Sequence, residues 1–242
     1  MCATSPYACR GRSADAGAEH NPRRVAWTNG ACITISIGME SALACPAPRG
    51  RPREFDVDAA LASALRVFWL RGYEGASLTE LTEAMGVTRP SLYACFGNKE
   101  ALFRKALDLY EREKLAYIET ALEADTVRGV AERLLRGALK QQSSSCDPKG
   151  CLGVTSSLAC GPEAESIKAE VIARRAPAHA ALIARFERGK AEGDLPATIE
   201  PHALASYLYA IMQGLLVQAS TGASCAELGS LVETTLAIWP GR

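Results

Sequence analysis

The chain has 242 residues and a formal net charge of zero, with 48% hydrophobic and 22% charged residues. This composition is typical of a globular protein with a sizeable core, and it excludes a histone-like polycation and a wholly disordered polyelectrolyte. The charge is unevenly distributed, because residues 1–53 carry seven arginines against three acidic residues. Such a basic arm is a common means of reaching a nucleic-acid groove, and a solubilising tail is the alternative.

Nine cysteines are spread along the chain without a compact framework. An odd, scattered set argues against a disulfide scaffold, so we expect reduced thiols. No secretory signal is apparent near the N-terminus, and no apolar run reaches the roughly 18–20 residues of a membrane span. The sequence therefore predicts a cytoplasmic protein without a membrane partner.

Residues 1–53 lack sustained periodicity and are rich in glycine, proline, alanine, serine and arginine. We expect this segment to be a disordered basic extension. Met39 lies inside it, and a start there would remove no recognisable element. The true start of the protein is therefore left open by the sequence.

From residue 56 onward, apolar residues recur at helical spacing and do not alternate as in strands, which predicts an all-α fold. The first helix is expected at about 58–71, with Leu61, Leu65 and Phe68 on its apolar face and Gly72 at its end. Further helices are expected at about 78–85, 89–95 and 98–123, and in the C-terminal half at 125–141, 151–159, 163–191, 200–220 and 225–238.

Local signals fix the second and third helices closely. Ser77 and Glu80 predict a capping box at the start of the second helix, and Gly86 ends it. Thr88 can cap the third helix, with Pro90 in its first turn. Residues 77–95 therefore predict a helix-turn-helix, in which the second helix of the pair enters the DNA major groove. A pair of short helices inside a bundle is the alternative.

The stretch from Phe55 to Phe103 resembles the DNA-binding domain of the TetR/AcrR family of transcriptional regulators. The segments that carry the resemblance are Ala64–Phe68, Arg71–Ser77, Leu81–Tyr93 and Phe96–Phe103. The resemblance implies a three-helix DNA-binding domain at residues 54–103, preceded by the extension 1–53. It also implies a helical ligand-binding and dimerisation domain at residues 104–242.

The resemblance further implies a role for each residue of the DNA-facing surface. Arg51 and Arg53 would lie in an arm near the minor groove or the backbone. Ser77 and Thr79 would meet phosphate at the N-terminus of the second helix, where free N–H groups and the helix dipole favour an anion. A purely capping role is the alternative for Ser77.

The third helix would supply the base contacts, and Arg89 is the side chain best suited to bidentate contact with guanine. Tyr93 and Lys99 would contact phosphates; packing on the first helix is the alternative for Tyr93 and plain solvation for Lys99. Cys95 departs from the Tyr or His usual in the family and puts one backbone contact in doubt. The residues expected to face base edges are Thr88, Arg89, Pro90 and Ser91.

The last two helices carry more apolar residues than one bundle must bury, and the resemblance implies a homodimer formed there. Two copies would then present two reading helices about one DNA turn apart, matching a palindromic operator. The resemblance also implies a pocket for a small-molecule effector, whose identity the sequence does not reveal. No cofactor is expected.

Three cysteines in the C-terminal half offer a different sensing chemistry. Cys146, Cys151 and Cys160 can sense oxidants, electrophiles or a soft metal such as copper(I). Their spacing fits no standard zinc pattern, and small buried core residues are the alternative for Cys151 and Cys160.

No Gly-rich phosphate loop, His-Glu-x-x-His or Gly-x-Ser-x-Gly pattern occurs, so we do not expect an enzyme. A helical small-molecule carrier with a weakened DNA reader is a further alternative, suggested by Cys95. The resemblance implies above all a ligand-responsive repressor that an effector releases from its operator.

Overall fold

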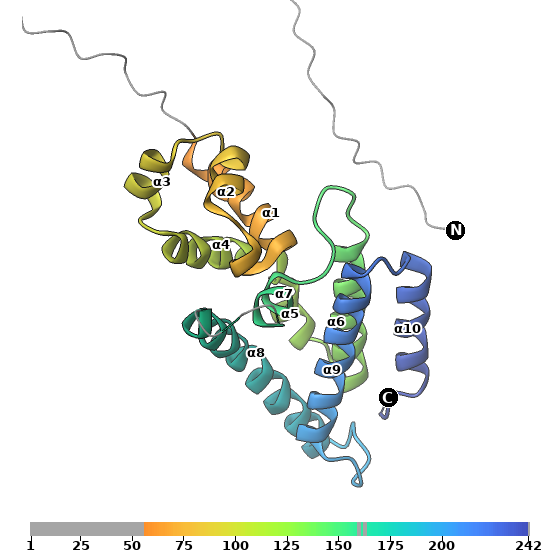
Figure 1. Cartoon of the computed structure of the whole chain (residues 1–242). Coiled ribbons are helices and arrows are strands. Elements are labelled where there is room, and N and C mark those ends of the chain that lie inside the picture. The colour runs from red at the N-terminus through yellow and green to blue at the C-terminus, as the bar shows by residue number, and fades with distance from the viewer. Residues whose placement is uncertain (1–55, 159–160, 162–163, 242) are drawn as a thin grey trace, which may run out of the picture. The chain divides into compact units, whose positions relative to one another are not determined.

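The computed structural model describes residues 56–158, 161 and 164–241, and these residues form helices without any strand (Figure 1). The predicted all-α class is confirmed. Arg51, Arg53 and Cys160 lie outside the described residues. The helices are α1 (Val57–Gly75), α2 (Leu78–Met85), α3 (Arg89–Phe96), α4 (Lys99–Lys114), α5 (Tyr117–Leu122), α6 (Val127–Gln142), α7 (Leu152–Leu158), α8 (Glu165–Ala191), α9 (Pro201–Ser220) and α10 (Cys225–Ala237).

The boundaries of α1 to α3 follow local chemistry, largely as predicted. The carboxylate of Asp56 accepts the backbone N–H groups of residues 58 and 59 and caps α1. Gly72, with φ of +72°, interrupts the regular helix where the sequence predicted its end, and a last helical turn continues to Gly75. Gly86 ends α2 with φ of +66°, a left-handed conformation that costs glycine little. Thr88 then caps α3, as expected.

The predicted single helix over 98–123 is wrong, because the chain bends after Lys114 and begins α5 at Tyr117. No glycine or proline marks this bend. Its cause lies in packing: the Tyr117 ring lies so close to Gly137 of α6 that a Cβ there would stand 2.3 Å from the ring. The bend lets α5 pack on α6 and bury Ala121.

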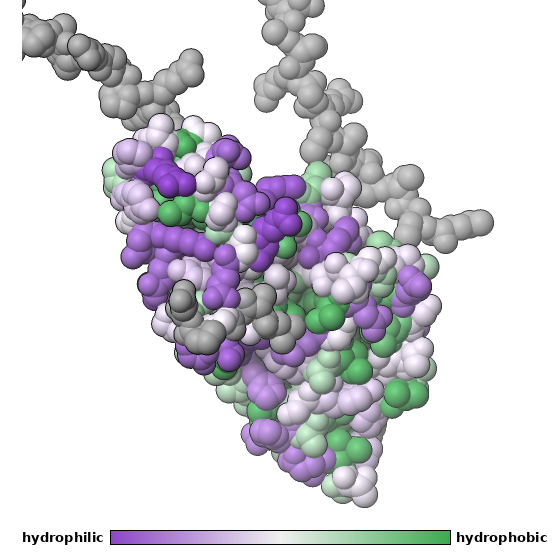
Figure 2. Space-filling view, in the orientation of Figure 1, coloured by the Kyte–Doolittle hydropathy of each residue, from purple (hydrophilic) through white to green (hydrophobic). Residues whose placement is uncertain are grey.

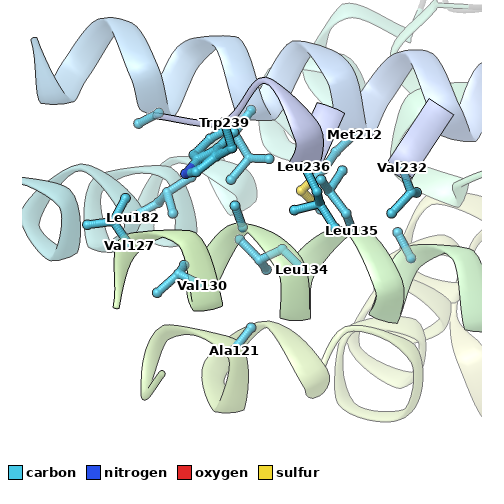
Figure 3. Close-up of a cluster of buried hydrophobic side chains, with 14 of the residues drawn as sticks. Ala121, Val127, Val130, Leu134, Leu135, Leu182, Met212, Val232, Leu236 and Trp239 are labelled. Carbon is cyan, nitrogen blue, oxygen red and sulfur yellow. The ribbon is translucent and has the colours of Figure 1, made fainter. Parts of the chain in front are cut away.

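Buried apolar side chains form two clusters. One lies among α6, α8, α9 and α10, and Figure 3 shows Leu134, Leu182 and Trp239 converging in it. The other joins the core of α1 to α4 with Leu152 of α7 and Ile167 of α8. The first four helices are therefore packed directly onto α7 and the start of α8. Helix α4 crosses the predicted domain boundary at residue 103, which stays a prediction.

No helix in the described part of the chain is both long enough and apolar enough to span a membrane.

Candidate DNA interface and effector cavity

Helix α3 divides cleanly into a buried side and an exposed side. Leu92 and Phe96 are 0% and 3% exposed and attach the helix to the core of α1 to α4. On the opposite side the residues expected to read bases are accessible: Ser91 is half-buried, and the others, Thr88, Arg89 and Pro90, are exposed. The structure thus holds α3 by its apolar side and leaves its hydrogen-bonding side open.

A hydrogen bond between side chains connects the starts of α2 and α3. The Nη2 atom of Arg89 donates to the Thr79 hydroxyl at 2.9 Å. The Thr88 hydroxyl accepts the backbone N–H of Ser91 and lies 2.9 Å from the Ser91 hydroxyl. Two predicted DNA-contact residues, Arg89 and Thr79, are therefore neighbours. Arg89 is an exposed cation with a defined position.

The capping box at Ser77 forms as predicted. The Ser77 hydroxyl accepts the Glu80 backbone N–H at 3.1 Å and donates to the Glu80 carboxylate at 3.0 Å. The backbone N–H of Ser77, which donates to the Glu80 carboxylate at 3.1 Å, and then the Ser77 hydroxyl hold the pKa of Glu80 below its usual value. The only donor of the Ser77 hydroxyl is thus already in use, so a phosphate at this helix end would compete with the Glu80 carboxylate.

Tyr93 and Lys99 lie on either side of the Gly97 turn that ends α3. Tyr93 is 47% exposed, so its ring is available rather than packed on α1. The Lys99 ammonium lies 4.6 Å from the centroid of the Tyr73 ring and 3.5 Å from the Glu74 carbonyl oxygen. Burial lowers the pKa of Lys99, while the nearby Glu74 charge opposes this shift. Lys99 is therefore positioned rather than freely solvated.

Cys95, the residue that departs from the family pattern, is an exposed free thiol in the last turn of α3. A thiol is a weak hydrogen-bond donor. If the family's backbone contact is made from this position, the side chain present here contributes little to it.

A cavity of about 730 Å³ lies between the C-terminal end of α4 and helices α5, α7, α8 and α9. Its polar groups are few and include Tyr117, Tyr209, Gln213 and Arg175. A cavity of this size and lining is typical of a small-molecule site. Most of its wall is apolar, formed by residues such as Leu115, Ile118, Leu122, Val154, Met212 and Leu216.

Cys151 reaches this cavity because the loop before α7 is held in place. The side chain of Gln142 accepts the Gly150 N–H at 2.7 Å, and the Trp69 indole donates to the Gly150 carbonyl at 3.3 Å. Gly150 itself has φ of +85°. The Cys151 thiol lies beside two tyrosine hydroxyls, those of Tyr110 and Tyr117, whose pKa values are raised mainly by burial.

The described residues offer no metal site. Cys146 is exposed whereas Cys151 is partly buried at the cavity. No group of three or more His, Cys, Asp or Glu residues in the described part of the chain is arranged to hold a metal ion. His179 and His202 come within 6.2 Å of each other, centroid to centroid, and pack edge to face.

A network of ion pairs connects α4 with α8. Arg174 donates to Asp108 at 2.6 Å, to Glu111 at 3.1 Å and to Glu170 at 3.1 Å. Glu170 also accepts from Arg104 at 2.6 Å. These side chains are partly exposed, and Glu111 and Arg174 also line the cavity. The network thus joins the helix that follows the reading helix to the cavity wall.

Sequence reasoning did not find this network or the polar residues of the cavity. The acidic and basic residues of α4 and α8 recur at a spacing of four, a pattern that also predicts pairs within one helix. Arg175 and Tyr209 carry no local signal, because only the packing of α8 on α9 places them at one cavity.

Comparison with known proteins finds relatives of this chain. Residues 60–106 match the model described as "Bacterial regulatory proteins, tetR family". The HTH-type transcriptional repressor ComR of Escherichia coli K12 is 36% identical over 194 residues, which are 79% of this chain and 92% of ComR. The repressor BdcR of the same organism is 30% identical over 151 residues, 57% of this chain and 76% of BdcR.

Solved structures of TetR family regulators also resemble this chain. A cysteine mutant of the TetR family transcriptional regulator CifR, complexed with 26-bp double-strand operator DNA, has a TM-score of 0.73 and 42% identity, covering 78% of this chain and 100% of CifR. A putative TetR transcriptional regulator from Rhodococcus sp. RHA1 has a TM-score of 0.54 and 36% identity over 76% of this chain and 98% of its own.

The family model covers the helices in which the sequence suggested a DNA reader, and the ComR match extends through nearly the whole described structure. The family comprises DNA-binding transcriptional regulators and not enzymes. This chain belongs to the TetR family of bacterial transcriptional regulators.

Proposed function

We propose that this regulator is a repressor that binds a palindromic operator as a homodimer and leaves it when a small molecule occupies the cavity. The observation that carries the proposal is the exposed polar side of α3, with Arg89 held at its start. Its relatives ComR and BdcR are named transcriptional repressors. Because the partner is chromosomal DNA, the protein acts in the cytoplasm.

The DNA contacts divide into base reading and phosphate binding. Arg89 reads a guanine in the major groove, assisted by its neighbours in the first turn of α3. Thr79, Tyr93 and Lys99 contact phosphates on either side and fix the register without reading sequence. Ser77 contributes mainly by capping α2, and the basic arm with Arg51 and Arg53 adds contacts near the minor groove.

The homodimer forms through α9 and α10. One side of α9 presents an accessible, uncharged stripe at helical spacing, and Figure 2 shows apolar surface over the part of the molecule where Figure 1 has α9 and α10. Tyr207 and Val217 are 40% and 37% exposed there, and Ile238 after α10 is 67% exposed. The α9 stripe consists of Ala203, Tyr207, Ala210, Gly214 and Val217.

Gly214 gives a sharp test of this dimer. A Cβ at Gly214 would meet no atom within 4 Å, so an arginine there fits one copy of the chain without a clash. We expect Gly214→Arg to give monomers in sedimentation velocity, because it places charge and bulk in the interface. Ala180→Arg, at an exposed position of α8, is the matched control and stays dimeric. A dimeric Gly214→Arg protein would contradict the proposed interface.

The effector acts by a population shift. A ligand that prefers the arrangement with the reading helices too far apart weakens DNA binding by its difference in affinity for the two arrangements. The cavity wall includes Glu111 and Arg174, whose ion pair joins α4 to α8. Occupancy of the cavity therefore acts on the helix that directly follows α3.

The deciding experiment is capture of fragmented genomic DNA from the source organism by the purified full chain, followed by sequencing of the retained fragments. We expect a few enriched sites that share a palindrome. Retention that is sensitive to salt but blind to sequence would contradict the proposal and favour a small-molecule carrier with a weakened reader. Restoring DNA selectivity by Cys95→Tyr would then identify the cause.

A second candidate is a regulator released by reaction at a thiol. The observation that favours it is Cys151, a free thiol in the cavity wall beside Tyr110 and Tyr117. A protein in which Cys146, Cys151 and Cys160 are all replaced by serine separates the two mechanisms. Release from the operator that survives this replacement excludes the thiol mechanism.

A further inference from the structure

The charged residues around the cavity are unequally partnered. Glu111 is bound to Arg174 at 3.1 Å, and Arg112 lies 3.8 Å from Glu113 at the exposed rim. The remaining charged residues of the lining are Glu119, which is exposed, and Arg175. Arg175 takes part in no ion pair or hydrogen bond found in the described part of the chain.

The Arg175 guanidinium is also partly removed from water. Its Nη2 atom is buried and lacks a hydrogen-bond partner among the described residues. It lies over α7 at Gly153, where a Cβ would stand 2.8 Å from Nη2. A glycine at this position thus leaves the space that the guanidinium occupies. A guanidinium that is partly buried and has no partner for its buried N–H group is costly, so this site favours an anion.

The rest of the cavity selects the body of that anion. Ile118, Leu122, Met212 and Leu216 make one wall apolar, and the volume of about 730 Å³ suits a ligand of drug-like size. We propose that the effector is a monoanionic carboxylate with an apolar body, whose carboxylate binds Arg175. This inference rests on the proposed function, since it names the chemical class of the effector.

A carboxylate fits better than other charged groups. The guanidinium fork binds a carboxylate through two parallel N–H donors. Arg112 and Arg174 already have carboxylate partners, so Arg175 is the guanidinium of the lining that has none among the described residues, and one negative charge balances it. A phosphate monoester would bring a second charge into an apolar wall, and an ammonium compound would repel Arg175.

Matched probe pairs test the proposal without DNA. Isothermal titration of the full chain with decanoate and decanol, 4-phenylbutanoate and 4-phenylbutanol, and 2-naphthoate and 2-naphthalenemethanol separates the headgroup from the body. We expect at least one acid to bind about tenfold more tightly than its alcohol, as a charge-assisted bond in a dry site should provide. Equal affinity within every pair, or no binding by any acid, would overturn the proposal.

Variants then assign the preference to one residue. Arg175→Gln should remove the preference for the acid while alcohol affinity changes less than about threefold, because the apolar wall is intact. Arg175→Lys should restore part of the preference. Arg188→Gln is the matched control, since Arg188 is an exposed arginine of α8 that does not line the cavity. A preference that survives in Arg175→Gln, or is lost in Arg188→Gln, refutes the assignment. If Arg175→Gln fails to fold, the difference in affinity between each acid and its alcohol on the unmodified chain still tests the preference for a carboxylate.

Operator binding and the preference for acids can be lost independently of each other. A chain that binds a palindrome but shows no preference for acids keeps the proposed function and loses this inference. A chain that prefers acids but binds no DNA selectively keeps the cavity chemistry and loses the repressor. The same acid should release the chain from its operator, and Arg175→Gln should stay bound.

Discussion

Two serines in this protein make nearly identical capping boxes, and only one of them lies on the DNA-facing side. Ser77 accepts the Glu80 N–H at 3.1 Å and donates to the Glu80 carboxylate at 3.0 Å. Ser224, at the start of α10, accepts the Glu227 N–H at 3.2 Å and donates to its carboxylate at 2.7 Å. Alanine at either position therefore removes the same bonds from the same kind of helix end.

The lost capping bonds set the expected loss of folding free energy. Loss of a serine N-cap costs about 1 kcal/mol of folding free energy. For a chain of this size that loss lowers the melting temperature by about 2–4 °C. We expect Ser77→Ala and Ser224→Ala to show equal losses within that range, measured by thermal unfolding followed by circular dichroism.

The two serine variants should differ in their affinity for the operator. If the Ser77 hydroxyl turns from Glu80 to a phosphate in the complex, Ser77→Ala loses one hydrogen bond worth about 1 kcal/mol, or about fivefold in affinity. Ser224→Ala, which leaves α2 and α3 unchanged, should bind operator like the unchanged protein as long as sedimentation velocity shows that it is still a dimer. If the two variants bind operator equally well, Ser77 acts only as a helix cap and does not contact phosphate. Unchanged melting of both would refute the energetic reasoning itself.

Three other outcomes are expected. Arg89→Ala should lower affinity by about 1–3 kcal/mol on the preferred operator and relax selectivity at one base pair, as measured by binding to single-base variants. Lys99→Ala should weaken binding to all DNA sequences alike. It should also reduce by about one the slope of log affinity against log salt concentration; a sequence-selective loss would contradict a phosphate contact. Glu80 and Glu227 have pKa values held below 4.5 by their serine partners, so they stabilise the fold above that pH. Their contribution should fade as pH falls through the lowered values. The largest part of each shift comes from the backbone N–H of the serine, which alanine retains, so acid unfolding of the two serine variants should show only slightly less of this loss.

The features that sequence reasoning predicted are those with local causes. Ser77, Thr88 and Asn98 cap their helices because each places an oxygen near free N–H groups a few residues ahead. Gly86 closes α2 because a left-handed residue is needed there. Spacing along one helix likewise explains why Leu92 and Phe96 are buried while Arg89 is exposed.

The features that escaped prediction depend on which helices meet. The bend before Tyr117 has no local cause, because its partner Gly137 lies on a different helix. Likewise, Arg174 and Arg175 are consecutive residues of α8, yet Arg174 bonds to α4 and Arg175 lies over α7. No periodicity distinguishes their roles, since a difference of one position turns a side chain by about 100° around the helix.

That adjacency suggests how an occupied cavity would reach the reading helix. Arg175 lies against α7 whereas Arg174 bonds to α4, so we expect a carboxylate on Arg175 to act on the ion pairs of Arg174 through a movement of α8 and not by direct competition. Each of these partly exposed pairs is worth only about 0.2–1 kcal/mol. Their sum is comparable to a typical allosteric coupling of about 1–3 kcal/mol, so a ligand that loosened them would change operator affinity measurably. Because only two residues separate the end of α3 from the start of α4, and both helices contribute to one buried cluster, we expect a shift of α4 to turn α3 with it.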